Sequence, residues 1–374
     1  MRGEVRWPSV KRLVLVGPGH AHLFVLEALA RAPWPGVETV LVSRGRTQLY
    51  SGRVPGYLAG QYALEALSFD LEALARAAGA RLEPGGVTGL DADRRELRLG
   101  DGRTLTYDAA SFDIGSLPAG DSVPGVHEHA VSLKPLEGAL SRLASRQEAG
   151  PLLVVGGGAA GVELALCLQA RTGRPTVLLE DGDQVPRGAS RAAARQVRGL
   201  LERRGIHLRL ESRVTALEAG VAHLDSGERL TFGTCVWATG ARAPELFTAS
   251  GAAVDAQGYL AVGDTLESPS HPGLFAAGDC AGFLSGQHVP KAGVYAVRQG
   301  LVLRHNLHVF LTGTGTPRPY RAQSGFLSLL NAGDGTAVGA WKGLAFHGRS
   351  MWRLKDFIDG RFMERFQRLA LPLT

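Results

Sequence analysis

The chain has 374 residues, 45% of them hydrophobic and 20% charged, a balance that is ordinary for a soluble enzyme of two or three domains. Its formal net charge of +6 comes from arginines spread along the sequence, without an uninterrupted basic block or interleaved aromatic residues, which argues against nucleic-acid binding. Its three cysteines are far apart and form no CxxC pair, which argues against a zinc site and indicates a reducing compartment such as the cytoplasm.

The first predicted element is a short buried strand that runs into the glycine-rich turn 17–22 (Gly-Pro-Gly-His-Ala-His) and then into a helix. This order suits a dinucleotide, because small residues let the backbone approach a pyrophosphate and the start of a helix attracts its charge. His22 stands where a third glycine is expected, and the next strand, 37–42, ends in Ser43 and Arg44 instead of an acid. On its own, this turn is equally compatible with a simple tight turn.

A second strand, turn and helix follow in the middle of the chain. The turn 156–161 (Gly-Gly-Gly-Ala-Ala-Gly) has all three glycines, and the next strand, 176–179, ends in Glu180. An acid in this place holds both hydroxyls of an adenosine ribose and repels a 2′-phosphate, so NADH is favoured over NADPH. Each half also carries a predicted hairpin, over 97–107 and 222–231. Two such turns in one chain predict two bound dinucleotides and electron transfer between them.

The last third of the chain begins with an apolar strand that delivers Gly278 and Asp279 to a loop, and Pro290 is well placed to begin a helix over 292–299. The C-terminal segment then carries an apolar stripe at helical spacing among basic residues, and two interpretations of it stay open. It is either an amphipathic helix on a membrane surface, or a helix that covers the first nucleotide-binding domain or forms a homodimer interface. No stretch reaches the roughly 18 consecutive apolar residues of a membrane span. The stripe comprises Met351, Leu354, Ile358, Phe362, Phe366 and Leu369.

The order of these motifs resembles that of the pyridine-nucleotide-disulfide oxidoreductase superfamily. Besides the two turns, the resemblance rests on Asp113-Ile114-Gly115-Ser116, Ala238-Thr239-Gly240 and Gly278-Asp279. The chain looks most similar to the branch of type II NADH dehydrogenases and sulfide:quinone oxidoreductases, and particularly to the flavoprotein region fused to selenophosphate synthase in some proteins. The segments that carry this closer resemblance are 17–22, 50–56 (Tyr-Ser-Gly-Arg-Val-Pro-Gly) and 289–296 (Val-Pro-Lys-Ala-Gly-Val-Tyr-Ala).

The resemblance implies an α/β fold with two doubly wound Rossmann-like domains of the glutathione-reductase type, one for FAD and one for NAD. The FAD domain is expected to comprise residues 10–112 and 243–320, and the NAD domain residues 113–242. The remaining segment, 321–374, is expected to form a C-terminal cap.

The resemblance also assigns cofactor-binding residues to both domains. Contacts with FAD are expected from Gly17, Gly19, His20, Ala21, His22, Ser43, Arg44, Pro55, Gly56, Val87, Ile114, Gly115, Gly278, Asp279, Pro290, Lys291 and Ala292. Contacts with NADH are expected from Gly156, Gly158, Ala160, Gly161, Glu163, Glu180, Thr239 and Gly240. A packing role for His20 and His22 is an equal alternative.

Two residues are candidates for a direct role in the chemistry. A lysine near the negative charge of a reduced flavin raises its reduction potential, and Lys291 is the candidate; the alternative is an exposed surface lysine. Glu163, on the first helical turn after the second glycine motif, matches the superfamily glutamate that approaches the nicotinamide. The alternative is an ordinary acid stabilised by the start of the helix.

The expected function is hydride transfer from NADH to FAD and onward transfer of electrons to a quinone or another small acceptor, with no metal. Cysteine pairs of the disulfide reductases are missing, so relay through thiols is disfavoured. Two alternatives remain open: a reductase or oxidase of a sulfur or selenium species, and a slow-turnover flavoprotein that senses redox state. The expected location is the cytoplasm, with the C-terminal segment as a candidate contact to the inner face of the cell membrane.

Overall fold

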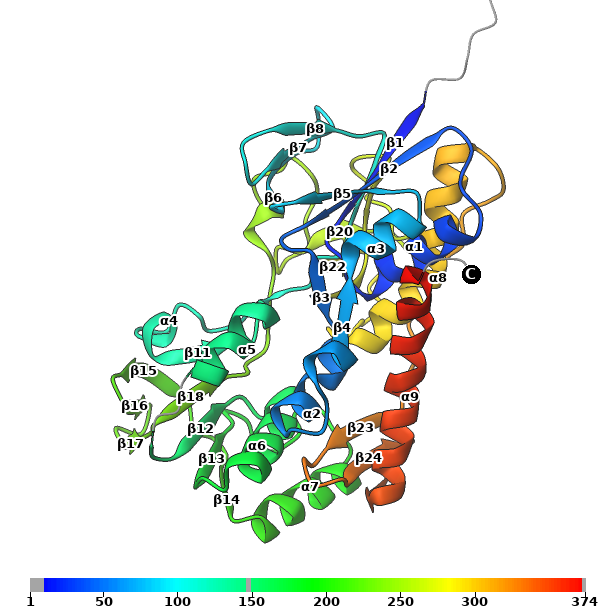
Figure 1. The fold of residues 1–374 in the computed structure, drawn as a ribbon. Helices are drawn as coiled ribbons and strands as arrows, with labels where there is room; N and C mark the ends of the chain where they lie inside the picture. The colour runs from blue at the N-terminus through cyan, green and yellow to red at the C-terminus, as the bar shows by residue number, and fades with distance from the viewer. Residues whose placement is uncertain (1–9, 146–148, 372–374) are drawn as a thin grey trace, which may run out of the picture.

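The first glycine-rich turn follows the central strand of a five-stranded parallel sheet in the computed structural model, which describes residues 10–145 and 149–371 (Figure 1). The strand order of this sheet is β21-β9-β1-β2-β5, and every pairing is parallel. Because β21 comes from the second half of the chain, the chain leaves this sheet after β9 and returns later to complete it. The strands are β1 (Lys11–Val16), β2 (Val37–Ser43), β5 (Arg81–Pro84), β9 (Ala109–Phe112) and β21 (Leu274–Ala276).

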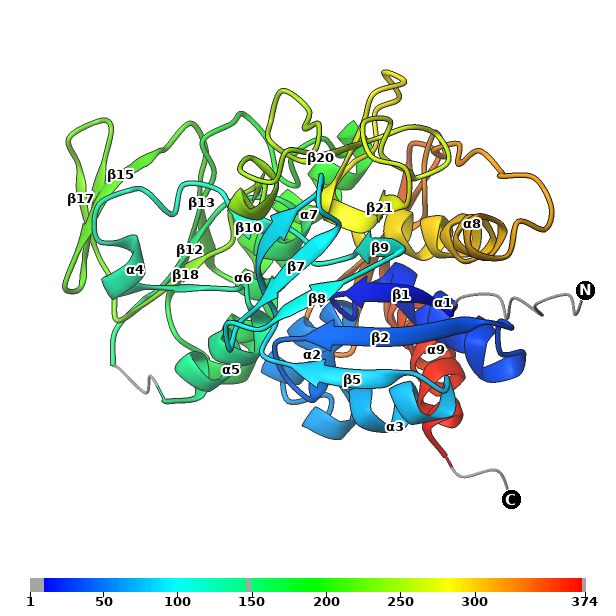
Figure 2. The ribbon, with the colours of Figure 1, turned by 90° about the horizontal axis from the view of Figure 1, so that it is seen from above.

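Two layers cover this first sheet. Leu13 and Leu15 of β1 pack under α1 (His20–Arg31), α3 (Leu71–Ala77) and α8 (Gly293–Thr312). Figure 2 shows the strands of this sheet side by side, seen from above. Val14 and Val16, which point the other way, pack under an antiparallel sheet of β6 (Val87–Asp91), β7 (Glu96–Leu99) and β8 (Thr104–Thr106). This alternation explains the uninterrupted apolar sequence of the strand, because both of its faces are buried.

A second five-stranded parallel sheet has the order β11-β18-β12-β13-β14. Its strands are β11 (Ala130–Ser132), β12 (Leu152–Val155), β13 (Thr176–Leu179), β14 (Ile206–Arg209) and β18 (Thr234–Trp237). The helices α6 (Ala159–Thr172) and α7 (Arg191–Arg203) pack on it, and the Ser190 side chain caps α7 by accepting the Ala193 N–H. The two parallel Rossmann-like units confirm the predicted α/β fold class.

The chain passes between the two units through a short antiparallel pair, β10 (Leu117–Pro118) with β19 (Ala241–Arg242). Both predicted hairpins are present, β7 with β8 and β16 (Val221–Leu224) with β17 (Arg229–Thr231). Each is extended to three strands by the strand that precedes it, β6 in the first and β15 (Val214–Glu218) in the second. In both cases the third strand adds buried apolar residues to the core, Leu90 from β6 and Val214 and Leu217 from β15.

The C-terminal segment forms β23 (Ser328–Asn331), β24 (Ala337–Trp341), β25 (Leu344–Gly348) and the long helix α9 (Arg349–Gln367), followed by the short turn η5 (Arg368–Ala370). α9 runs alongside both units, from β24 to α1 (Figure 1). Phe366 and Met363 are buried against α1 and α3, and Phe362 packs beside them. This part of the predicted stripe therefore covers the first unit.

The remaining elements are short. They are β3 (Thr47–Leu49), β4 (Ser68–Asp70), α2 (Val54–Leu58), α4 (Val126–His129), α5 (Leu136–Ser145), β20 (Leu260–Val262), β22 (Ala281–Phe283) and the 3-10 turn η4 (Gly278–Cys280), with three further turns, η1 (Ser51–Arg53), η2 (Leu64–Leu67) and η3 (Glu245–Phe247). α8 is longer than the predicted helix over 292–299, because its apolar positions continue to Leu311 and only the left-handed Gly313 ends it. The predicted domain boundaries stay predictions.

Candidate active site

Two glycine-rich cradles begin the helices α1 and α6. The first cradle comprises residues 17–22 and the second comprises residues 156–161. Gly17 and Gly156 both have left-handed backbones, with φ of +87° and +108°, which favour glycine. Both turns lie at the carboxyl ends of parallel strands, where doubly wound sheets bind nucleotides.

The second cradle has the regular form. Glu180, 3% exposed, accepts the N–H groups of Gly157 and Gly182 at 2.7 and 2.8 Å and forms an ion pair with Arg187. It thus lies beside the turn, as expected of the acid that binds a ribose. The predicted contacts Thr239 and Gly240 lie next to Ala119, whose carbonyl accepts the Thr239 hydroxyl.

The first cradle departs from this form at His22. Its ring is fully buried, with Nδ1 2.5 Å from the Gly17 carbonyl oxygen and Nε2 2.8 Å from the Ser111 hydroxyl. Burial lowers the pKa of His22 to about 4, so the ring is neutral. Because a carbonyl only accepts, Nδ1 carries the proton and Nε2 accepts from Ser111. Both ring nitrogens are therefore engaged inside the protein, where the second cradle has Gly161.

His20 of the first cradle lies among aromatic rings. Its ring centroid is 5.4 Å from that of Tyr50 and 5.6 Å from that of Phe362. Burial lowers the pKa of His20 to about 4, although the charge of Asp279 opposes the shift. Three parts of the chain therefore meet at this neutral ring: the first cradle, the segment that follows β3, and the helix α9.

Asp279 and Gly278 stand at the edge of the first cradle. The Gly278 N–H donates to the Gln299 side chain at 2.6 Å. The Asp279 carboxylate accepts the Ser116 hydroxyl at 3.1 Å and pairs with Lys134 at 3.1 Å. Lys134 is a partner that the motif pattern did not reveal, because it belongs to the loop after β11.

Lys291 is half-buried rather than fully exposed. Its ammonium donates to the Ala281 carbonyl at 2.6 Å and lies 3.7 Å from the ring centroid of Tyr259. Burial lowers the pKa of Lys291, although the neighbouring Cys280 and Asp279 oppose the shift. The contact with Ala281 directs this ammonium toward β22.

Other predicted contacts with FAD lie close to the first cradle. Ser43 ends β2, where its carbonyl accepts the Gly86 N–H at 3.0 Å, and the Arg44 side chain packs against Gly86. Val87 begins β6 directly after this glycine. Four more of the predicted FAD contacts lie around this cradle. Ile114 is beside Gly17, Gly115 follows Ile114 in the sequence, and Pro290 and Ala292 come just before α8.

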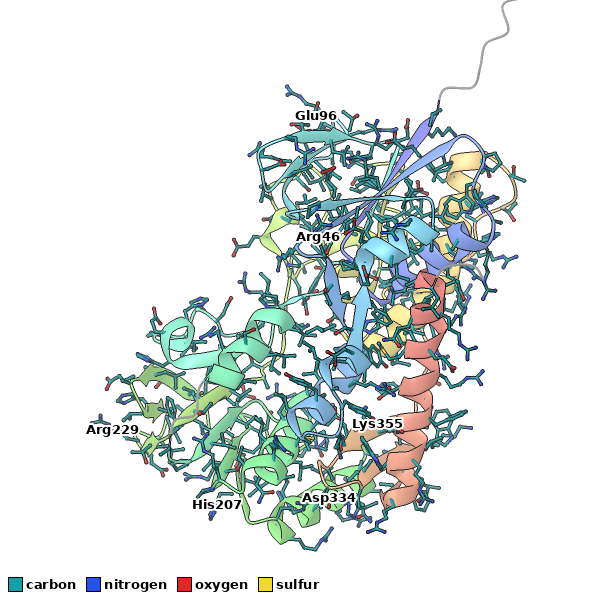
Figure 3. The ribbon with its side chains drawn as sticks, viewed as in Figure 1. Arg46, Glu96, His207, Arg229, Asp334 and Lys355 are labelled. Carbon is teal, nitrogen blue, oxygen red and sulfur yellow. The ribbon has the colours of Figure 1, made fainter. Side chains whose placement is uncertain are left out.

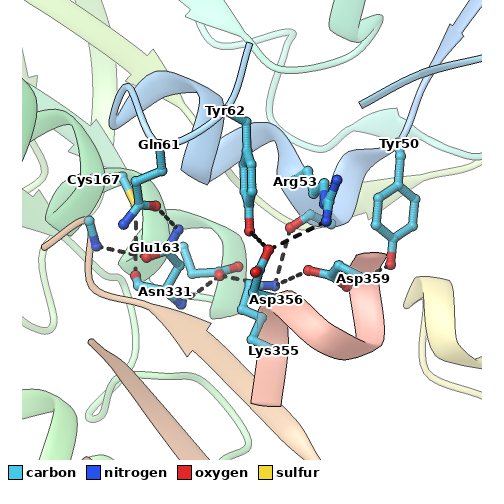
Figure 4. A network of polar contacts seen from close by, with 12 residues as sticks. Tyr50, Arg53, Gln61, Tyr62, Glu163, Cys167, Asn331, Lys355, Asp356 and Asp359 are labelled. Atoms are coloured by element: carbon cyan, nitrogen blue, oxygen red, sulfur yellow. Dashed lines mark hydrogen bonds and ion pairs between the residues drawn. The ribbon is translucent and has the colours of Figure 1, made fainter. Parts of the chain in front are cut away.

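A buried polar network joins α6, α9 and β23 (Figure 4). The Glu163 carboxylate on α6 accepts the Asn331 N–H at 2.8 Å and lies 3.8 Å from the Lys355 ammonium. Lys355 also lies 3.2 Å from the Asp359 carboxylate and donates to the Gly52 carbonyl at 3.1 Å. Figure 3 shows Lys355 on the inner side of α9. This cation therefore connects both units of the protein.

The network has consequences for protonation. Burial raises the pKa of Glu163, although the Lys355 charge opposes the shift. Burial lowers the pKa of Lys355, but the carboxylates of Glu163 and Asp359 outweigh this and raise it above its ordinary value. The Tyr50 hydroxyl donates to Asp359 at 2.9 Å, and burial together with that carboxylate raises the pKa of Tyr50. Lys355 is therefore a buried ammonium that stays protonated.

The same network fixes the segment 50–62. Tyr62 donates to Asp356 at 2.7 Å, and the Arg53 guanidinium lies 4.5 Å from the Tyr62 ring centroid. The Gln61 side chain accepts the Asn331 amide at 2.7 Å. The predicted Pro55 and Gly56 lie on α2 within this segment, and a Cβ on Gly56 would be 2.5 Å from the Tyr62 ring. Sequence reasoning missed Lys355, Asp359 and Asn331, since the first two look like part of an ordinary solvated helix face and Asn331 lies at the end of a short strand that no motif marks.

Comparisons with known proteins identify the family of the chain. The family model "pyridine nucleotide-disulphide oxidoreductase" matches residues 11–300. The chain is 31% identical over 297 residues to the NADH dehydrogenase-like protein MT1860 of Mycobacterium tuberculosis, covering 72% of each chain. It is 24% identical over 323 residues to the demethylphylloquinone reductase NdbB of Synechocystis, covering 81% of this chain and 80% of the relative.

Solved structures show the same fold. The sulfide:quinone oxidoreductase of Aquifex aeolicus superposes with a TM-score of 0.79 at 17% identity, over 96% of this chain and 92% of the other. The resemblance to the region fused to selenophosphate synthase stays a prediction. The chain belongs to the pyridine nucleotide-disulphide oxidoreductase family and is an NAD(P)H-dependent flavoprotein oxidoreductase with FAD and NADH as its cofactors.

Proposed function

We propose that this protein oxidises NADH and delivers the electrons to a quinone or another small acceptor, with FAD supplying the hydride-accepting chemistry between them. The observation that carries this proposal is the buried contact between Glu163, near the start of α6 after the second cradle, and Lys355 on α9. A quinone takes up two protons with two electrons, so its reduction needs a proton donor sheltered from bulk water. Glu163 and Asp359 keep Lys355 charged in buried surroundings, so this ammonium carries a proton at a sheltered place.

The division of roles follows from the contacts. Asp359 and Glu163 keep Lys355 charged from two sides, and Tyr50 orients Asp359. Lys355 would release a proton from its ammonium to the reduced acceptor, and one of its carboxylate partners would guide the replacement proton. Glu163 lies on α6, the helix that begins at the second cradle, so its predicted role toward the nicotinamide is retained in this proposal. Lys291 remains the candidate for stabilising negative charge near the flavin.

Relay of electrons through thiols fits the chain poorly. Cys280 is fully buried, and burial raises its pKa to about 12. Burial likewise raises the pKa of Cys167 well above its ordinary value. Reactive cysteines need a stabilised thiolate and access to solvent. This favours a quinone-type acceptor over a sulfur or selenium species for this protein.

The acceptor can reach the protein from a membrane surface. Phe357 and Ile358 on α9 are 62% and 43% exposed, and the Arg361 guanidinium lies 5.9 Å from the Phe357 ring centroid. Leu344 and Phe346 on β25 are also exposed, beside arginines of α7 in a hollow of about 320 Å³. Apolar side chains among arginines suit an anionic lipid surface. Within residues 10–145 and 149–371, no helix is long and apolar enough to cross a bilayer.

The test uses the purified holoprotein under anaerobic conditions. Mixing with NADH should bleach the visible flavin spectrum, and later addition of a soluble quinone should restore it. Turnover above about 1 per second would be typical of an enzyme and would argue against a slow-turnover redox sensor. A flavin spectrum that stays oxidised with NADH, or that is restored by sulfide-derived acceptors and by no quinone, would contradict the proposal. Flotation with anionic and neutral vesicles tests the membrane contact separately.

A further inference from the structure

The two cradles are built alike, which allows a direct comparison within one chain. β1 pairs with β9, and β12 pairs with β18, in the same register at their carboxyl ends. Asp113, the first residue after β9, therefore holds the position that Ala238 holds after β18. The glycines agree: a Cβ on Gly17 would lie 2.6 Å from the Asp113 carbonyl oxygen, and one on Gly156 would lie 2.5 Å from that of Ala238. The first cradle thus has a carboxyl group where the second has a methyl group.

This carboxyl group lies where a dinucleotide turn makes room for phosphate. The second glycine of such a turn lets the backbone approach the pyrophosphate. In the second cradle, a Cβ on Gly158 would meet no described atom within 4 Å. In the first cradle, a Cβ on Gly19 would collide with the Asp113 carboxyl group, and one on Gly278 would lie 2.6 Å from its Oδ1.

Asp113 also uses the amides at the start of α1. Its Oδ2 accepts the N–H groups of Ala21 and His22 at 2.7 and 3.2 Å, and the residue is 4% exposed. Amides at a helix start are the groups that attract the pyrophosphate in this type of fold. A carboxylate in this place competes with the phosphate for the same positive end of the helix.

We propose that Asp113 couples flavin binding to proton uptake: the FAD pyrophosphate is accepted next to a neutral Asp113, and its binding protonates this carboxyl group when it is charged. The proton comes from solvent and forms one O–H bond on the Asp113 carboxyl. No other bond forms or breaks. A neutral carboxyl keeps one oxygen free to accept the two amides, so the start of α1 need not rearrange.

Asp113 is the group at the first cradle whose pKa lies near neutrality, whereas its titratable neighbours have pKa values far from 7 or are paired. Burial raises the pKa of Asp113 to about 7, the amides of His22 and Ala21 oppose this, and Asp279 adds to it. On α1, His20 and His22 have pKa values lowered to about 4. On η4, Cys280 has its pKa raised to about 12, and Asp279 is paired with Lys134. Lys291, farther along the chain, contacts Ala281 and Tyr259.

Linkage gives the expected pH dependence. Below pH 7 Asp113 is already protonated before FAD arrives, so the dissociation constant should not change with pH. Above pH 7 each unit of pH should weaken FAD binding by up to about tenfold, because one proton must be taken up. Binding of NADH to the second cradle, which has Ala238, should lack this dependence.

The experiment measures protons rather than turnover. FAD is titrated calorimetrically into the full-length protein stripped of flavin, in two buffers of different ionisation enthalpy, at about pH 6 and about pH 8.5. We expect close to one proton taken up per FAD at the higher pH and close to none at the lower, and none at either pH for Asp113→Asn. No uptake by the unmodified protein at the higher pH, or equal uptake by Asp113→Asn, would overturn the proposal.

Two further variants guard against misfolding and test the position itself. Asp113→Ala copies the second cradle and should also bind FAD without proton uptake; an unchanged dissociation constant for NADH shows that a variant is folded. Ala238→Asp places the acid in the second cradle and should make NADH binding weaken as the pH rises. If it leaves NADH binding independent of pH, the position does not couple phosphate to a proton, and the proposal fails.

Discussion

Lys355 and Glu163 face one another across the boundary between α9 and α6, with 3.8 Å between Nζ and Oε1 and only 10% and 13% of their side chains exposed. They are nearly 200 positions apart in sequence, yet they share one buried site. Such a pair is costly to break, because removal of one partner leaves the other charge buried. This relationship makes Lys355 the most informative residue for mutation.

Substitution of Lys355 by Met should separate the two half-reactions. Reduction of the flavin by NADH should persist, whereas reoxidation by a quinone should slow by about 100-fold. This factor is the lower end of the rate loss expected when a general acid is removed. Stopped-flow absorbance measures each step. Arg353→Met, on the exposed side of the same helix, is the control and should leave both rates unchanged. Equal slowing of both steps by Lys355→Met would show a structural role only.

Substitution of Glu180 by Gln should change coenzyme preference. The charge that repels a 2′-phosphate is lost, and Arg187 loses the partner that holds it at the turn. We expect KM for NADH to rise by about tenfold and the discrimination against NADPH to fall by a similar factor. Steady-state kinetics with both coenzymes measure this. Asp181→Asn, next to it and more exposed, should alter the preference far less.

His22 should make stability depend on pH. Its pKa is about 4 in the folded protein and near 6.5 when unfolded, so the unfolded state binds more protons between these values. The contribution of His22 to the free energy of unfolding is fully present above pH 6.5. It decreases by about 3 kcal/mol as the pH falls toward 4. Urea denaturation at pH 7 and pH 5 should show a smaller difference for His22→Gln than for the unmodified protein. His207→Gln, at the outer rim in Figure 3, should retain the full difference.

Phe366 should anchor α9. Its ring is fully buried, and its centroid lies 5.1 Å from that of Phe24. Phe366→Ala should lower the free energy of unfolding by about 4 kcal/mol, since it leaves a cavity in the core. Phe357→Ala, with a ring 62% exposed on the same helix, should change it by less than about 0.5 kcal/mol. Similar losses in both variants would contradict the packing described for α9.

The parts of the fold that were predictable depend on neighbours in sequence. The two cradles, Glu180 and both hairpins follow from short patterns, because a strand, a tight turn and a helix start are determined within a few residues. The length of α8 was underestimated, since its end depends on Gly313 rather than on its beginning. The lysine at position 355 could not be found this way, because only its contact with Glu163, far away in the sequence, makes its position exceptional.

Asp113 is a different case, because a signal was available. The two cradles repeat one plan, and alignment of Asp113-Ile114-Gly115 with Ala238-Thr239-Gly240 puts an acid opposite an alanine. The sequence pattern drew attention to the glycine and not to the residue two places before it. What the pattern could not supply was the direction of the carboxyl group, which depends on the amides of α1.

The pairing of β10 with β19 places both crossings of the chain side by side, as one narrow ribbon. A ribbon alone would act as a hinge between the two nucleotide-binding halves. α9 adds a separate brace, since Phe366 is embedded in one half and Lys355 is paired with the other. Rotation of one half against the other would have to remove the Phe366 ring from the core or leave the buried Lys355 without its charged partner. We therefore expect coenzyme exchange to proceed by local side-chain movement, with the two halves fixed relative to one another.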